Sequence, residues 1–182
     1  MRDVNTVIYD DLNYILSNLK IEFLKLSGKK LLITGGAGFL GYYLIKSILF
    51  WNEKNPDKSP INLKVYDNFL RGTPKWFYEY KLNENFSFEN YDIINPIPNS
   101  LGQIDFIIHA ASIASPTYYR KYPIETMDAN VTGLRNLLNY SIDLKSKKLP
   151  LSGFLFFSTS EIYGDPFPEY IPTSEDYRGN VS

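Results

Sequence analysis

The sequence predicts an α/β protein with a doubly wound parallel sheet and an N-terminal helical extension. Three observations predict this class: short apolar runs alternate with stretches of helical periodicity, a glycine-rich turn follows the first run, and an acid ends the second. Parallel strands need long crossovers, and the helices in those crossovers cover both faces of the sheet.

The first expected element is an amphipathic helix over residues 8–26, because apolar residues recur there at spacings of three and four. Gly28 ends it, so residues 1–28 form the extension and residues 29–182 the main domain. Strands are expected at 30–34, 63–67, 86–88, 104–110 and 154–158, with helices at 39–51 and 124–144. Beyond residue 164, Pro166, Pro168 and Pro172 indicate a loop.

Composition restricts the possible functions. The chain has 182 residues, 44% of them hydrophobic, and a net charge of -1, so it can bury one core and carries no general attraction for nucleic acid or anionic membranes. It has no cysteine and a single histidine, which argues against disulfides, a catalytic thiol and a metal site. The N-terminus has acids where a signal peptide has basic residues, and a cytoplasmic location is expected.

Residues 31–51 carry one charge, Lys46, and are long enough to cross a bilayer. The four glycines within 35–41 oppose a membrane helix, whereas a strand, turn and helix account for each of them. Gly35 allows a tight turn, Gly38 allows close approach of the backbone to a pyrophosphate, and Gly41 allows the helix to pack closely on the sheet. The free N–H groups of the following helix then suit a dinucleotide phosphate.

Asp67, at the end of the second strand, suits the hydroxyls of an adenosine ribose and favours NAD over NADP. Arg71 points the other way, because a nearby arginine suits the additional phosphate of NADP.

Five segments together resemble the extended short-chain dehydrogenases that modify nucleotide sugars, the NAD-dependent epimerase/dehydratase family. They are TGGAGFLG (34–41), YDNF (66–69), YDII (91–94), HAAS (109–112) and STSEIYG (158–164), and the resemblance spans about residues 29–178. It is nearest to the branch of UDP-glucuronate decarboxylases and dTDP-glucose 4,6-dehydratases. It implies a Rossmann-type NAD-binding domain, a nucleotide-sugar substrate and a homodimeric full-length protein.

The resemblance also assigns residues to the cofactor. The residues expected around NAD are Gly35, Gly38, Phe39, Leu40, Asp67, Asn68, Leu70, Arg71, Gly72, Asp92, Ile93, Ala110 and Ser112. Arg71 stands where the family usually has a small hydroxyl residue. Tyr118, Tyr119 and Tyr122 are suited equally to lining the sugar pocket and to covering the edge of the core. The resemblance points most to Tyr119, and it also places Asn130 at the substrate.

Thr159, Ser160 and Glu161 follow the last expected strand, and the resemblance makes them catalytic. Thr159 is expected to bind the sugar hydroxyl that is oxidised, and Glu161 to act as an acid or base. Dehydratases of the family carry an aspartic acid at the position of Ser160, and serine cannot be that acid at neutral pH. Decarboxylation of a UDP-uronic acid through a 4-keto intermediate is therefore favoured over dehydration. A 4,6-dehydratase or an epimerase is the alternative. The residues alone also allow a simple turn cap here.

The family's catalytic Tyr-x-x-x-Lys is missing. Tyr42 and Lys46 alone have its spacing, and they are expected as two surface groups on the helix after the glycine turn. His109, at the end of an apolar strand, is expected to be structural. The sequence therefore predicts a C-terminally incomplete enzyme that is inactive by itself, or else a non-catalytic NAD-binding module.

Overall fold

The computed structural model describes residues 3–180 and contains one five-stranded parallel sheet with the order β3-β2-β1-β4-β5. The strands are β1 (Lys30–Thr34), β2 (Asn62–Asp67), β3 (Phe86–Asn90), β4 (Phe106–His109) and β5 (Gly153–Phe156). This order confirms the doubly wound class. The chain runs outward from β1 to β3 and then returns to β4, so the order reverses between β1 and β4, where ligands bind in such sheets.

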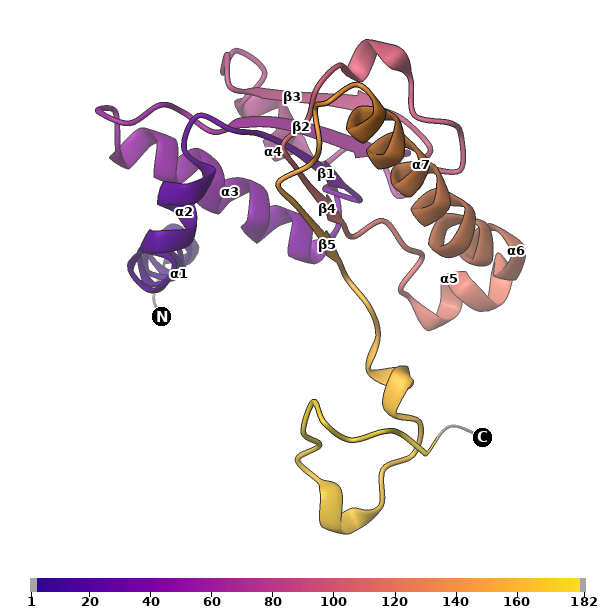
Figure 1. Cartoon of the computed structure of the whole chain (residues 1–182). Helices are drawn as coiled ribbons and strands as arrows, with labels where there is room; N and C mark the ends of the chain where they lie inside the picture. The colour runs from indigo at the N-terminus through magenta and orange to yellow at the C-terminus, as the bar shows by residue number, and fades with distance from the viewer. Residues whose placement is uncertain (1–2, 181–182) are drawn as a thin grey trace.

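Helices cover both faces of the sheet (Figure 1). The α-helices between residues 3 and 180 are α1 (Val4–Asn18), α2 (Lys20–Leu26), α3 (Phe39–Lys54), α4 (Lys75–Glu79), α5 (Pro116–Lys121), α6 (Pro123–Met127) and α7 (Gly133–Ser146). On one face Ile45 and Ile48 of α3 pack with Ile33 of β1. On the other face Leu137 of α7 packs with Ile107 of β4. Because a parallel sheet is buried on both sides, the middle residues of the central strands are apolar, 31–33 in β1 and 106–108 in β4.

The N-terminal extension is two helices, so the single helix expected over 8–26 is wrong. The chain breaks at Leu19, where φ is -113° and ψ is 26°. The break lets each half place an aromatic ring on α3: Tyr9 meets Phe50 edge to face at 5.6 Å, and Phe23 stacks on Trp51 at 5.1 Å.

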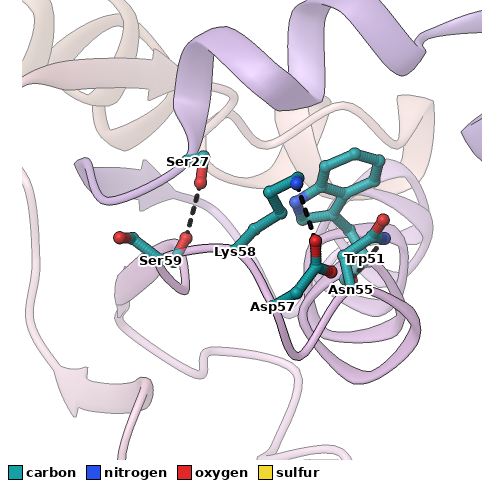
Figure 2. A network of polar contacts seen from close by, with 6 residues as sticks. All are labelled: Ser27, Trp51, Asn55, Asp57, Lys58 and Ser59. Atoms are coloured by element: carbon teal, nitrogen blue, oxygen red, sulfur yellow. Dashed lines mark hydrogen bonds and ion pairs between the residues drawn. The ribbon is translucent and has the colours of Figure 1, made fainter.

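The end of α2 is tied to the loop before β2 (Figure 2). The Ser27 hydroxyl donates a 2.7 Å hydrogen bond to the Ser59 carbonyl, and the Gly28 N–H donates to the same oxygen at 3.0 Å. In that loop Lys58 pairs with its neighbour Asp57 at 2.7 Å. The extension is thus part of the domain rather than a free tail.

Two short helices, α4 and α5, were not expected, because five or six residues do not establish a helical period. The helical stretch expected over 124–144 has an irregular start: α6 and α7 are joined by a π-helical turn, Asp128–Thr132. Between residues 3 and 180, no helix has both the length and the apolar character needed to cross a membrane.

Candidate functional site

A cavity of about 420 Å³ opens at the carboxyl ends of β1, β2 and β4, where the strand order reverses. Every residue that the resemblance assigns to the cofactor lines it, from Gly35 at the glycine turn to Ser112 beyond β4. The site expected from separate segments is therefore brought together in space. Its use for NAD stays a prediction.

At Gly35 and Gly41 a side chain would collide with backbone atoms, so the turn requires glycine at both. Gly35 has a φ of +74°, and a Cβ there would lie 2.5 Å from the Ala111 Cα. A Cβ on Gly41 would lie 2.2 Å from the Gly36 carbonyl oxygen, so Gly41 packs α3 on the turn itself and not on the sheet as expected. At Gly38 a Cβ would touch only the Gly35 carbonyl oxygen, at 3.4 Å.

Helix α3 begins at this turn. Its first residues, Phe39, Leu40 and Gly41, line the cavity with Gly38, and no side chain caps the N-terminus. The N–H groups of a first helical turn lack partners within the helix, and the helix dipole is positive at that end. This end of the cavity, next to an unobstructed glycine, is therefore suited to an anion.

Asp67 connects two walls of the cavity. One carboxylate oxygen accepts the Ala37 N–H at 2.9 Å and the other accepts the Phe69 N–H at 2.8 Å. Asn68 donates its side-chain amide to Asp92 at 3.1 Å. Asp67 and Asp92 place negative charge on either side of Asn68 in the cavity wall, where ribose hydroxyl donors suit it and a further phosphate does not.

The structure decides between neighbouring tyrosines and adds a lining residue, Ala129, that the sequence did not indicate. Tyr118 of α5 lines the cavity, whereas its neighbour Tyr119 does not. Ala129, in the π-helical turn, also lines it, and the adjacent Asn130 does not. The substrate roles of Tyr119 and Asn130 stay predictions. Among tyrosines in a row, only the phase of the helix decides which one faces the cavity, and that phase follows from packing.

The segment after β5 leads away from the cavity. Phe157 still lines it, but Thr159, Ser160 and Glu161 are exposed and do not. The Thr159 hydroxyl accepts the Glu161 N–H at 3.3 Å, which is the turn cap considered above. The following segment extends away from the sheet (Figure 1) and closes on itself, with Gly164 bridged to Asn180. The catalytic roles of the three residues stay predictions.

The Tyr42–Lys46 pair also lies outside this cavity, but it is not the two surface groups expected. The Lys46 side chain is 13% exposed. Its ammonium donates to the Tyr80 hydroxyl at 2.9 Å and lies over the Tyr42 and Trp76 rings. Lys46 thus fastens α4 to α3. The sequence did not show this because α4 itself was not expected.

His109 is structural, as predicted. It is 1% exposed, its Nδ1 lies 2.7 Å from the Thr34 hydroxyl, and its Nε2 has no partner within residues 3–180. Burial lowers the pKa of His109 to about 4. The ring is therefore neutral at physiological pH and contributes no positive charge beside the cavity.

This pKa has a consequence for stability. Below pH 6.5 the unfolded chain protonates His109 while the folded chain does not. The free energy of unfolding therefore decreases as the pH is lowered from 6.5 to about 4. The shift corresponds to about 3 kcal/mol over that interval. Denaturant unfolding between pH 4 and 7 measures it, with His109→Gln as the matched variant lacking the titration. If both proteins lose stability equally on acidification, the His109 contribution is refuted.

The parallel sheet, the reversal of strand order and the cavity at a glycine turn define a Rossmann-type nucleotide-binding fold. A family model for the NAD dependent epimerase/dehydratase family matches residues 31–180. The chain belongs to this family. Within residues 3–180 there is no group of His, Asp and Glu side chains that could hold a metal ion.

Relatives with known activities have similar sequences. UDP-glucuronic acid decarboxylase 2 of Arabidopsis thaliana is 34% identical over 159 residues, which cover 87% of this chain and 32% of that protein. UDP-glucuronic acid decarboxylase 1 of Danio rerio is 35% identical over 154 residues, which cover 85% of this chain and 32% of that protein. The chain thus spans about a third of the length of these relatives.

Solved structures share the fold. A UDP-galactose 4-epimerase aligns with a TM-score of 0.62 and 22% identity over 83% of this chain and 44% of that one. The dTDP-glucose 4,6-dehydratase of Streptomyces venezuelae, solved with NAD bound, aligns with a TM-score of 0.60 and 23% identity. The alignment covers 76% of this chain and 42% of that one.

Proposed function

We propose that this chain is the NAD-binding part of a nucleotide-sugar decarboxylase that acts on a UDP-uronic acid. The observation that carries the proposal is the single cavity lined by all the residues assigned to the cofactor. Similarity to UDP-glucuronic acid decarboxylases supports this reaction over others in the family.

The cavity fits NAD in shape and charge. The space beside Gly38 and the N-terminus of α3 suit the pyrophosphate, and Asp67 suits the ribose hydroxyls. When bound, NAD would take a hydride from the fourth carbon of the sugar and later return it. The chain's own residues would bind and orient the adenosine half, while Ala110 and Ser112 would pass beneath the nicotinamide.

The reaction type follows from Ser160. A ketone at the fourth carbon lies beta to the uronic carboxylate, so carbon dioxide can leave without an acid to protonate a leaving hydroxyl. Dehydration needs such an acid, and a serine hydroxyl does not supply it at neutral pH. Dehydration and epimerisation are the alternatives within the family.

A non-catalytic NAD-binding module is the second candidate, from another class of function. It is favoured by one observation, the exposure of Thr159, Ser160 and Glu161 outside the cavity. Both candidates bind NAD, and they differ in turnover.

Cofactor binding is the test common to both. Calorimetric titration of residues 1–182 is expected to show NAD binding with at least tenfold preference over NADP, because a phosphate beside the Asp67 carboxylate is repelled. Asp67→Asn removes that charge and is expected to bring the affinities for NAD and NADP closer together. Equal affinity of the unaltered chain for the two dinucleotides would contradict the assignment of Asp67.

A further inference from the structure

Arg71 is the one cationic side chain among the residues 3–180 that line the cavity. The lining also contains two carboxylates, Asp67 and Asp92, so the charged side chains around the cavity carry a net negative charge. A dinucleotide brings a further negative charge on each phosphate of its pyrophosphate. The N-terminus of α3 offsets part of this charge, and Arg71 alone among the lining side chains can offset more.

The backbone holds Arg71 in a defined position. The residue lies in a tight turn after β2, closed by a 2.7 Å hydrogen bond from the Gly72 N–H to the Phe69 carbonyl. The Phe69 ring packs edge to face with the Phe77 and Phe88 rings, with 5.8 and 6.1 Å between ring centres. The Asp67 carboxylate accepts the Phe69 N–H. The turn is thus fastened to the core on one side and to the glycine turn, through Asp67, on the other.

The Arg71 side chain connects two rims of the cavity. Its guanidinium lies 5.9 Å from the centre of the Tyr118 ring on α5, and both residues line the cavity. An exposed cation–π contact is weak compared with the paired, charge-assisted hydrogen bonds that a guanidinium makes to a phosphate. An anion in the cavity can therefore compete with the Tyr118 ring for this side chain.

Resting on the function proposed above, we infer that Arg71 binds the pyrophosphate of the dinucleotide and leaves the Tyr118 ring to do so. The resemblance places Arg71 near NAD, and this inference specifies the contact as an ionic one with the pyrophosphate. The repulsion by Asp67 and Asp92 favours the pyrophosphate over a phosphate on the adenosine ribose.

The experiment is a calorimetric titration of residues 1–182 with adenosine, ADP, NAD and NADP. Arg71→Ala is expected to lower the affinity for ADP and NAD by about tenfold, because the phosphates lose a partner. The affinity for adenosine, which has no phosphate, is expected to fall by less than about twofold. Arg71→Lys, which keeps the charge without the planar fork, is expected to recover part of the loss. The affinity for ADP is also expected to fall less steeply with salt in Arg71→Ala than in the unaltered protein.

Arg120→Ala is the matched control, because Arg120 is a cation on α5 that does not line the cavity. If Arg71→Ala and Arg120→Ala bind ADP alike, the inference is overturned. An equal loss for adenosine and ADP would show a structural role instead. A loss confined to NADP would assign Arg71 to a ribose phosphate, and that result also rejects the inference.

Failure of the proposed function gives a different pattern. Binding of ADP but not NAD by the unaltered chain would contradict NAD use, while the ADP series with Arg71→Ala would still decide the role of Arg71. Binding of neither nucleotide would overturn both.

Discussion

Replacing Gly38 with valine is expected to abolish NAD binding while leaving the fold intact. Gly38 has a φ of -78° and a ψ of 177°, which valine adopts without strain. The first atom of a side chain there would meet only the Gly35 carbonyl oxygen, at 3.4 Å. The rest of the valine would occupy the part of the cavity next to the N-terminus of α3. We expect NAD affinity to fall by at least about a hundredfold, since the pyrophosphate loses both its space and the helix N–H groups.

Calorimetric titration measures that loss, and thermal unfolding shows whether the fold survives. Gly41→Ala is the informative contrast: its Cβ would lie 2.2 Å from the Gly36 carbonyl oxygen, so this smaller change is expected to destabilise the protein. A stable Gly38→Val protein that still binds NAD as tightly as the unaltered chain would show that the pyrophosphate does not bind at this turn.

The strand, glycine turn and helix at the centre of the fold could be predicted because each leaves a local signal. Apolar runs of the right length, a glycine for a positive φ and helical periodicity all lie within residues 30–54. The break at Leu19 leaves no such signal, since it depends on Tyr9 and Phe23 both reaching α3. Short helices such as α4 could not be predicted for the same reason, because tertiary contacts and not helical periodicity hold them in place.

The candidate site shows the same division. Asp67 could be predicted at the cavity from its place at the end of a strand, but its two backbone partners could not. The Ala37 N–H, 30 positions away, reaches the carboxylate only because the glycine turn folds over β2. Tyr118 and Arg71 come from separate turns, and their contact depends on how α5 sits above the sheet. Pairings of this kind follow from the assembled fold.

The last expected result is that residues 1–182 bind NAD but do not turn over a UDP-uronic acid. Thr159, Ser160 and Glu161 lie outside the cavity, and the sequence has no Tyr-x-x-x-Lys except Tyr42–Lys46. That pair is no substitute, because the Lys46 ammonium is engaged with Tyr80 and neighbouring rings beyond the cavity wall. General acid–base catalysis contributes about 10²–10⁴-fold, and poor positioning of substrate costs more, so losing both leaves turnover below detection.

The measurement is mass spectrometry of the sugar nucleotide after incubation with UDP-glucuronic acid and NAD, with purity of the protein checked by intact mass. The decarboxylase of Danio rerio, 35% identical over 154 residues, is the positive control. A protein that joins residues 1–182 to a segment with Tyr-x-x-x-Lys is expected to release carbon dioxide, and to form no 4-keto-6-deoxy sugar from dTDP-glucose. That 4-keto-6-deoxy product would reverse the assignment based on Ser160.

Turnover by residues 1–182 alone would require another base, and the candidates are Tyr119, Glu161 and Tyr163. Each is now outside the cavity, so the segment after β5 or helix α5 would have to move when substrate binds. Glu161→Gln and Tyr163→Phe test this directly, because each removes the proton-transfer group and keeps the side-chain shape. Loss of that turnover in one variant, with NAD affinity unchanged, would identify the base and refute the separation of binding from catalysis. Absence of turnover by residues 1–182 and by both variants, with NAD still bound, is the result that the geometry predicts.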